Sequence, residues 1–195
     1  MINAPETFDC PPLPPMTRGE FWWEGTDTLT GWGDLQVQRH GYNLEPWPLG
    51  RVKVRAVTED PYRAPRPPFT FATPFPQQAR AYQFLRENSS ALFGQILEAV
   101  FQYYPEIRID YEDVPDVRST AELKKFIGIY EVTLSQMCKG DSAYIGFEFA
   151  CTWDSEHGLG VMTHGTRVLG VGQSVVADDL PPPDDGGVFA PNSQS

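Results

Sequence analysis

The densest group of chemically active side chains lies in segment 153–160, which reads Trp-Asp-Ser-Glu-His-Gly-Leu-Gly and joins two expected strands. Asp154, Glu156 and His157 fall within four positions of one another. Carboxylate and imidazole groups are acceptable ligands for first-row metals. Glu156 or His157 could also act as a general base. The segment is therefore a candidate active site of a small metal-binding enzyme or hydrolase.

Two non-catalytic interpretations fit the same segment. Trp153 could anchor a recognition surface formed by the polar loop. Alternatively, the segment is architectural: Asp154 suits an Asx-turn onto the backbone of Glu156, and Trp153 can cover the end of the core. Gly158 and Gly160 permit positive φ or a bulge. The spacing matches no common ligand set, since HExxH needs a second histidine one helical turn later, so architecture is favoured and the alternatives stay open.

Other catalytic patterns are missing from the sequence. It contains no GxGxxG, GxxxxGK[ST], G-x-S-x-G or CxxC motif. Its three histidines leave few ways to assemble a Ser/His or Cys/His site. Cys10, Cys138 and Cys151 have no paired spacing, which argues against a disulfide framework or zinc ribbon and fits a reducing cytoplasm. We expect no cofactor, no bound metal and no enzyme activity.

The charge balance predicts the class of partner. Fifteen Lys and Arg oppose 26 Asp and Glu, a formal net charge of −11. Such a surface repels nucleic acid and anionic membranes and attracts basic proteins. Four acids cluster within seven positions of the chain. We expect the partner-binding residues to be Asp110, Glu112, Asp113, Asp116, Trp153, Asp154, Glu156 and His157.

The first third of the chain has the patterns of β-strands. Segments 21–24, 35–38 and 51–57 are short and rich in aromatic or β-branched residues. In the last of them apolar residues occupy alternate positions, which predicts that Val54 faces the core and Arg55 faces water.

The middle of the chain has the pattern of helices. Segment 77–87 carries good helix formers. Ser89 or Ser90 is placed to cap a second helix, which Pro105 is expected to end. Its apolar positions follow a 3.6-residue period; they are Leu92, Phe93, Ile96, Leu97, Val100, Phe101 and Tyr104. We therefore predict a helical hairpin with one apolar face.

The last third returns to strands. A short helix begins at Ser119, which with Glu122 forms a capping box. Two hairpins follow, with turns at the Gly-containing segments 139–141 and 164–165. The expected strands are 129–134, 143–151, 159–163 and 166–171.

This order of elements predicts an α+β fold, an antiparallel twisted β-sheet with a helical hairpin packed on one face. One α+β domain, 18–177, lies between a Pro-rich extended arm, 1–17, and a disordered acidic, Pro-rich tail, 178–195. Both ends should bury little. The first residues lack a basic start and an apolar h-region, and apolar stretches are short, so we expect neither a secretory signal nor a membrane span.

Segment 143–172 closely resembles an uncharacterised bacterial domain family that ends in a Trp-Asp-x-Glu-His-Gly-x-Gly-Val strand pair. A looser resemblance extends over 35–176. The resemblance implies an immunity-like or accessory protein, as its members mainly are, and some of these members are encoded beside toxin genes. It assigns no catalytic role to Asp154, Glu156 or His157, which therefore gain prominence but no mechanism.

Together these observations predict a non-enzymatic, cytoplasmic binding protein. In this hypothesis it is an immunity protein whose acidic surface covers the active site of a cognate, basic toxin. The alternative is the small metal-binding enzyme or hydrolase that uses Asp154, Glu156 and His157.

Overall fold

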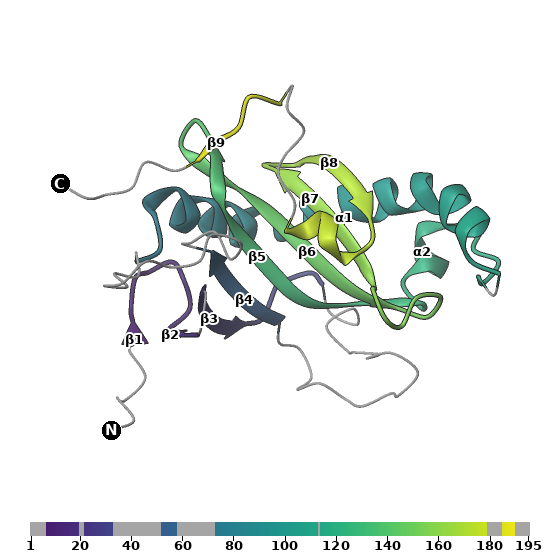
Figure 1. The fold of residues 1–195 in the computed structure, drawn as a ribbon, viewed down its shortest axis with the longest axis horizontal. Helices are drawn as coiled ribbons and strands as arrows, with labels where there is room; N and C mark the ends of the chain where they lie inside the picture. Colours follow the sequence, from purple (N-terminus) through teal and green to yellow (C-terminus); the bar gives the residue numbers. More distant parts are fainter. Residues whose placement is uncertain are drawn as a thin grey trace, which may run out of the picture.

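The structure is a computed structural model that describes residues 7–19, 22–32, 52–57, 73–112, 114–178 and 185–189. Its described part combines one sheet with a long helix, a short helix and a 3-10 helix (Figure 1), which confirms the α+β class. The helices are α1 (Pro76–Asp110), α2 (Thr120–Leu123) and η2 (Ser174–Ala177). The strands are β1 (Thr7–Phe8), β2 (Met16–Arg18), β3 (Trp22–Asp27), β4 (Val52–Val57), β5 (Ile127–Lys139), β6 (Ser142–Cys151), β7 (Leu159–His164), β8 (Arg167–Gly172) and β9 (Val188–Phe189).

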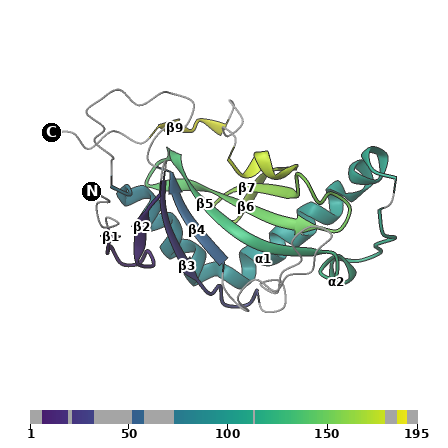
Figure 2. The same cartoon turned by 60° about the horizontal axis from the view of Figure 1, so that its bottom comes forward.

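The described strands follow chain order across the sheet from β1 to β8, and β9 pairs with β5. The pair β4–β5 is parallel and the other described pairs are antiparallel. The parallel pair follows from α1, which lies between these two strands in the chain and returns it to the same end of the sheet. Figure 2 shows α1 along one face of the sheet, hereafter the inner face, with η2 on the opposite, outer face.

The predicted helical hairpin is wrong, because the two expected helices form one helix bent at Asn88. Asn88 has φ −114° and ψ 16°, and its side-chain amide donates to the Phe84 carbonyl at 3.0 Å. The Trp32 indole N–H donates to the Ser89 carbonyl at 3.0 Å. Ser89 is thus an interior residue of the helix instead of an N-cap. The side-chain bonds satisfy helix carbonyls around the bend, so the chain kinks without stopping.

Pro105 was expected to end the helix, yet α1 continues to Asp110. Pro105 is exposed, so water can satisfy the carbonyl that its missing N–H leaves without a helical partner. The buried side chains of Tyr104 and Ile107 continue the apolar stripe past the proline. Packing of these side chains therefore outweighs the tendency of proline to end a helix. As a result, residues 106–110 form a last helical turn that the sequence analysis did not predict.

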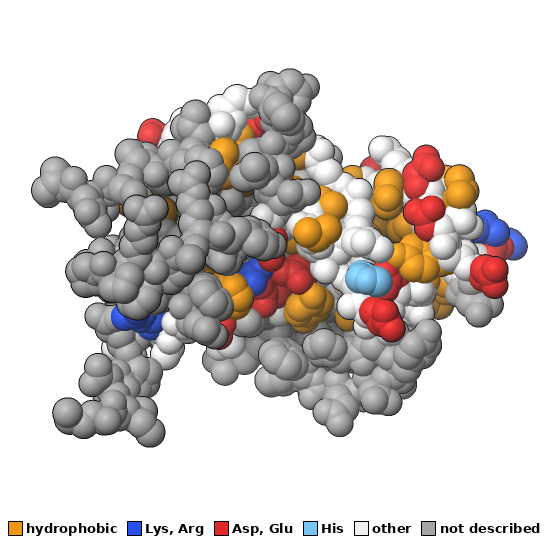
Figure 3. All heavy atoms as spheres, viewed as in Figure 1, with side chains coloured by type: hydrophobic (Ala, Val, Ile, Leu, Met, Phe, Trp, Pro, Cys, Tyr) orange, Lys and Arg blue, Asp and Glu red, His pale blue; other side chains and the backbone are white. Residues whose placement is uncertain are grey.

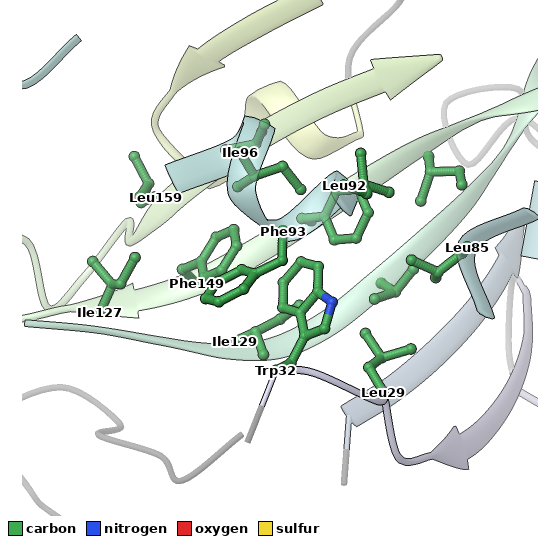
Figure 4. Packing of buried hydrophobic residues seen from close by; sticks show 14 of the residues in the cluster. Leu29, Trp32, Leu85, Leu92, Phe93, Ile96, Ile127, Ile129, Phe149 and Leu159 are labelled. Carbon is green, nitrogen blue, oxygen red and sulfur yellow. The ribbon is translucent and has the colours of Figure 1, made fainter. Parts of the chain in front are cut away.

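The core fills the space between α1 and the inner face of the sheet, as Figure 4 shows. Trp32 lies at its centre, 4.8 Å from the ring of Phe93 and 5.4 Å from that of Phe147, measured between centroids. The Gln78 amide, fully buried, donates to the carbonyls of Val57 and Leu134 at 2.7 and 2.9 Å. That amide fixes the start of α1 against the end of β4 and the middle of β5.

The segment 7–17 belongs to the fold, contrary to the expected peripheral arm. β1 and β2 pair with each other, and β2 pairs with β3. Leu13 and Met16 are only 4% and 1% exposed and join the core. The proline-rich segment between β1 and β2 forms a turn that places these apolar side chains in the core. Segment 7–17 therefore buries apolar surface.

On the outer face, η2 packs directly on the backbone of the sheet. A Cβ atom added to Gly146 would lie 1.9 Å from the carbonyl oxygen of Ala177. A Cβ at Gly160 would lie 2.5 Å from the carbonyl oxygen of Gln173. Because no side chain fits under η2 at these positions, the two glycines are what allow the helix to approach so closely.

The described parts of the C-terminal tail are also attached to the sheet. Asp185 is buried, accepts from the Tyr144 hydroxyl at 2.8 Å, and pairs with Lys139 at 3.4 Å and with Arg167. Strand β9 pairs with Met137 and Cys138 of β5. The tail was expected to be disordered, but Asp185 is buried, β9 pairs with β5, and Asp178 contacts Arg55, as described below.

Deleting 178–195 is accordingly expected to lower the melting temperature. The deletion leaves Lys139 and Arg167 without their buried carboxylate and removes the β9 pairing, a loss of about 2 kcal/mol or roughly 4–8 °C for a chain of this size. Differential scanning calorimetry measures the shift. Deleting only 190–195 is the control, because it keeps every contact described here. Equal melting temperatures for all three proteins would contradict the attachment of the tail.

Candidate functional site

Trp153 is the second residue of the loop between β6 and β7, and it closes one end of the core. It is 9% exposed, and its ring meets that of Tyr104 edge to face at 5.6 Å between centroids. The Tyr104 hydroxyl in turn donates to the Pro115 carbonyl at 2.8 Å. The prediction that Trp153 covers the core is confirmed, and its large buried ring fixes the start of the loop.

Asp154 organises the loop from a buried position. Its Oδ1 accepts the backbone N–H groups of Glu156 and His157 at 3.2 and 2.9 Å, which confirms the predicted Asx-turn. Its Oδ2 accepts the Tyr111 hydroxyl at 2.5 Å. Burial opposes ionisation of this carboxyl, but the bonds from Tyr111, His157 and Glu156 outweigh it and hold the pKa of Asp154 below its usual range. Both carboxylate oxygens are thus committed to the protein's own groups.

The other two candidate groups of the loop lie at the surface. Glu156 is exposed, and the His157 side chain is 58% exposed, with Nδ1 3.2 Å from Asp154 Oδ1. Gly158 adopts the expected positive φ, 68°. The loop therefore combines one buried carboxylate with two exposed side chains. Across the described residues, no three His, Cys, Asp or Glu side chains are grouped so that they could hold a metal ion.

The acidic segment that follows α1 is exposed where the structure describes it. Asp110 ends the helix, and Glu112 follows it. Asp116 pairs with Arg118 at 2.8 Å and with Arg108 at 3.5 Å, so part of its charge is locally balanced. Asp113 lies outside the described residues.

The fold brings this acidic segment and the β6–β7 loop together, although they are about 40 positions apart in the sequence. Tyr111 links them through Asp154, and its hydroxyl also accepts a hydrogen bond from Gln173 at 3.2 Å. We call the resulting surface the acidic end. Figure 3 shows acidic side chains and a histidine on this side of the molecule. Its described members are Glu106, Ile109, Asp110, Glu112, Asp116, Glu156 and His157, and the exposed Arg108 and Arg118, which pair with Asp116, lie beside them.

Ile109 is an apolar member of the acidic end that the sequence did not predict. It is 78% exposed, the largest exposure among the large hydrophobic side chains of the described chain. It lies in the last helical turn between Arg108 and Asp110. The sequence contained a signal for this exposure, because Ile109 is out of phase with the apolar stripe that ends in Tyr104 and Ile107. The signal was missed because the helix was expected to end at Pro105.

A second polar group lies on the outer face of the sheet and was also missed. Arg55, expected to face water, is only 8% exposed. Its guanidinium lies 2.8 Å from Glu131, 3.3 Å from Glu148 and 2.5 Å from Asp178, and stacks on Trp22 at 4.5 Å. We call Arg55, Glu131, Glu148 and Asp178 the Arg55 cluster. Three carboxylates surround one guanidinium there.

A bulge in β5 helps to build the Arg55 cluster. The register shifts between Ile129 and Glu131, and the Tyr130 hydroxyl donates to Glu148 at 2.6 Å. Burial raises the pKa of Glu148 to about 7; the charges of Glu131 and Asp178 act in the same direction, while Tyr130 and Arg55 oppose them. Single charged residues inside apolar strands, such as Glu148 within Phe-Glu-Phe, were the sequence signal for this cluster.

Comparison with protein families matches residues 69–177 to the domain of unknown function DUF6985. The match covers more than half of the chain, so the chain belongs to this family. It includes every member of the acidic end and excludes Arg55 and Asp178. Neither the curated proteins nor the solved structures gave a match.

No helix of the described residues is both long enough and apolar enough to cross a membrane.

Proposed function

We propose that this member of the DUF6985 family is a non-catalytic binding protein that neutralises a cognate bacterial toxin. In this proposal the acidic end docks over a basic active site of the toxin and excludes its substrate. The protein thus acts as an immunity protein in the cytoplasm, where it holds the toxin inactive. Basic active sites are typical of enzymes that handle phosphate groups, which makes them complementary to an acidic surface.

The observation that carries this proposal is the exposed Ile109 among the acids of the acidic end. Protein interfaces combine a small apolar centre with a polar rim, and a few central side chains supply most of the binding energy. Ile109 supplies such a centre, with Glu106 and Asp110 beside it and Glu112 following. The charges of the rim guide a basic partner to the surface, and Ile109 makes the desolvated contact.

The β6–β7 loop supports this surface from beneath. Trp153 packs against Tyr104 of α1, and Asp154 accepts the Tyr111 hydroxyl. These contacts fix the last turn of α1 relative to the loop, so the exposed acids keep their positions without a partner. A surface that is ordered before binding loses less conformational entropy in the complex. In the proposal, Trp153 and Asp154 therefore position the last turn of α1 and do not contact the partner themselves.

The proposal differs from the hydrolase alternative in what it asks of Asp154. A metal ligand or general base needs a carboxylate oxygen that can reach a metal or substrate. Both oxygens of Asp154 accept hydrogen bonds from the protein itself, and Glu156 and His157 lie at the surface. These contacts suit a structural carboxylate better than a catalytic one.

Charge reversal at the acidic end is expected to slow association with the toxin. Asp110→Lys combined with Glu112→Lys should reduce the association rate several-fold at low salt and leave the fold intact, because both side chains are exposed. The difference between variant and wild type should shrink as salt screens the charges. Surface plasmon resonance over a salt series measures both effects.

Asp110→Lys alone and Asp141→Lys are the matched pair in this experiment, because each of them changes the net charge by the same amount. Asp141 is an exposed acid in the turn between β5 and β6, at the opposite end of β6 from Trp153. Its reversal changes the net charge of the whole protein without changing the acidic end. Equal slowing by Asp141→Lys and Asp110→Lys would mean that only net charge matters, and unchanged kinetics in the double variant would show that the acidic end does not attract the toxin.

A further inference from the structure

The Arg55 cluster joins four separate segments of the chain on the outer face. Arg55 belongs to β4, Glu131 to β5 and Glu148 to β6, while Asp178 directly follows η2. The side chains of Glu131 and Glu148 are 7% and 13% exposed, but that of Asp178 is 42% exposed. Asp178 is therefore the carboxylate of this cluster that can leave for water at the lowest cost in burial.

Asp178 is also the point at which the cluster holds η2. Both of its carboxylate oxygens lie 2.5 Å from Arg55 Nη2, and its backbone N–H donates to the Val175 carbonyl at 3.0 Å. The backbone of η2 lies against Gly146 and Gly160, and its Val176 side chain packs against the cluster of Met137, Tyr144 and Met162. A change in the hold of Arg55 on Asp178 is therefore transmitted to the end of η2.

Glu148 shares its pairing with Arg55 with two other carboxylates, Glu131 and Asp178, and the register partner of Glu131 on β4 is Lys53. From β5 it faces Tyr130, which donates to it, and Glu131; from β4 it faces Arg55, and from the end of η2 it faces Asp178. Its register partner on β7 is Gly160, which carries no charge. On the far side of Arg55, the Trp22 ring lies against the guanidinium, and its indole N–H donates to Glu24.

We propose that the Arg55 cluster is a pH-responsive latch on η2, in which protonated Glu148 lets Arg55 hold Asp178 firmly and ionised Glu148 loosens Asp178. When Glu148 is protonated, Arg55 is shared by two carboxylates, those of Glu131 and Asp178. When Glu148 loses its proton, a third negative charge is added beside them. Repulsion then acts most on Asp178, because it is the partner with access to water.

The transition falls in the neutral range. Burial raises the pKa of Glu148 to about 7, with contributions in the same direction from Glu131 and Asp178. The latch is therefore closed below neutral pH and loosens above it. The coupling between the two carboxyls is reciprocal. If the charge of Asp178 raises the pKa of Glu148 by one unit, ionisation of Glu148 weakens the binding of Asp178 to Arg55 by about tenfold.

NMR spectroscopy of the full chain tests this latch directly. The side-chain carboxyl carbon of Glu148 reports its titration. Hydrogen-exchange protection factors of the Val176 and Asp178 amides, which donate to Gln173 and Val175, report the closure of η2. We expect Glu148 to titrate near neutral pH and both protection factors to fall several-fold as it ionises. Protection that stays constant across this titration would overturn the proposal.

Two variants assign the effect to the latch. In Glu148→Gln the protection of η2 should stay high and independent of pH, because no third charge forms. In Asp178→Asn the pKa of Glu148 should fall, and the size of that fall should match the loss of protection in the wild type, about tenfold per unit. A pH dependence that persists in Glu148→Gln, or an unchanged titration of Glu148 in Asp178→Asn, would contradict the latch.

Discussion

Arg55→Ala is expected to lower the free energy of unfolding by about 3–5 kcal/mol at about pH 8, because it removes the guanidinium that pairs with the buried carboxylates of Glu131 and Glu148. Glu131 and Glu148 are both largely buried, and Arg55 pairs with each of them. The loss should be smaller at about pH 5, where Glu148 is protonated in the folded protein. Its raised pKa means that the folded state binds more protons than the unfolded state in this range, so stability falls as pH rises.

Urea unfolding at the two pH values measures this effect. Arg80→Ala is the matched control: Arg80 is 48% exposed and pairs with Asp141 at 3.7 Å, so its loss should cost less than about 1 kcal/mol at either pH. The cost of Arg55→Ala should also be smaller in a Glu148→Gln background, since one buried charge is then absent. Similar costs for Arg55→Ala and Arg80→Ala would show that the cluster does not stabilise the fold.

Trp153→Ala is expected to destabilise the protein by about 3–5 kcal/mol, the usual cost of removing a large buried aromatic side chain. Trp153 is 9% exposed and packs edge to face against Tyr104. Its removal leaves a cavity under the last turns of α1, next to the loop that Asp154 organises. Thermal and urea unfolding measure the loss, and Trp153→Phe should recover part of it.

Ile109→Ala is the complementary control for Trp153→Ala. Ile109 is 78% exposed, so its truncation should change stability by less than about 0.5 kcal/mol. In the proposed function it should nevertheless weaken partner binding. The two variants thus distinguish a residue that stabilises the acidic end from a residue that contacts the partner there. A Trp153→Ala protein with wild-type stability and no partner binding would instead place the contact on the β6–β7 loop.

Local sequence patterns predicted those parts of the fold that depend on neighbouring residues. The turn at Gly140, with φ 60°, and the turn at Gly165, with φ 58°, lie between the expected strands. Ser119 accepts the Glu122 N–H at 3.2 Å, as its capping pattern predicted. The break expected between 87 and 90 coincides with the bend at Asn88, but the continuation as one helix was not predicted. One bond at the bend comes from Trp32, which is more than 50 positions away and in no local pattern.

The candidate site was predicted only in part for the same reason. The acids of the 110–116 segment and the loop residues Asp154, Glu156 and His157 were identified separately, by composition and by motif. The hydrogen bond between Tyr111 and Asp154 links these two segments in the fold, and no local sequence pattern predicts that bond. Arg55 was expected at the surface because alternation alone does not reveal that acidic residues of other strands meet it on the outer face.

Site-specific photo-crosslinking tests most directly the proposal that the acidic end contacts a toxin through Ile109. A photoreactive amino acid replaces Ile109 in one protein and Val175, an exposed apolar residue of η2, in a control. Both are expressed in the natural host. We predict that position 109 captures a basic protein whose activity the purified wild-type chain inhibits, and that position 175 does not. Capture at position 175 alone, or a protein captured at position 109 whose activity an excess of the chain leaves unchanged, would contradict the proposal.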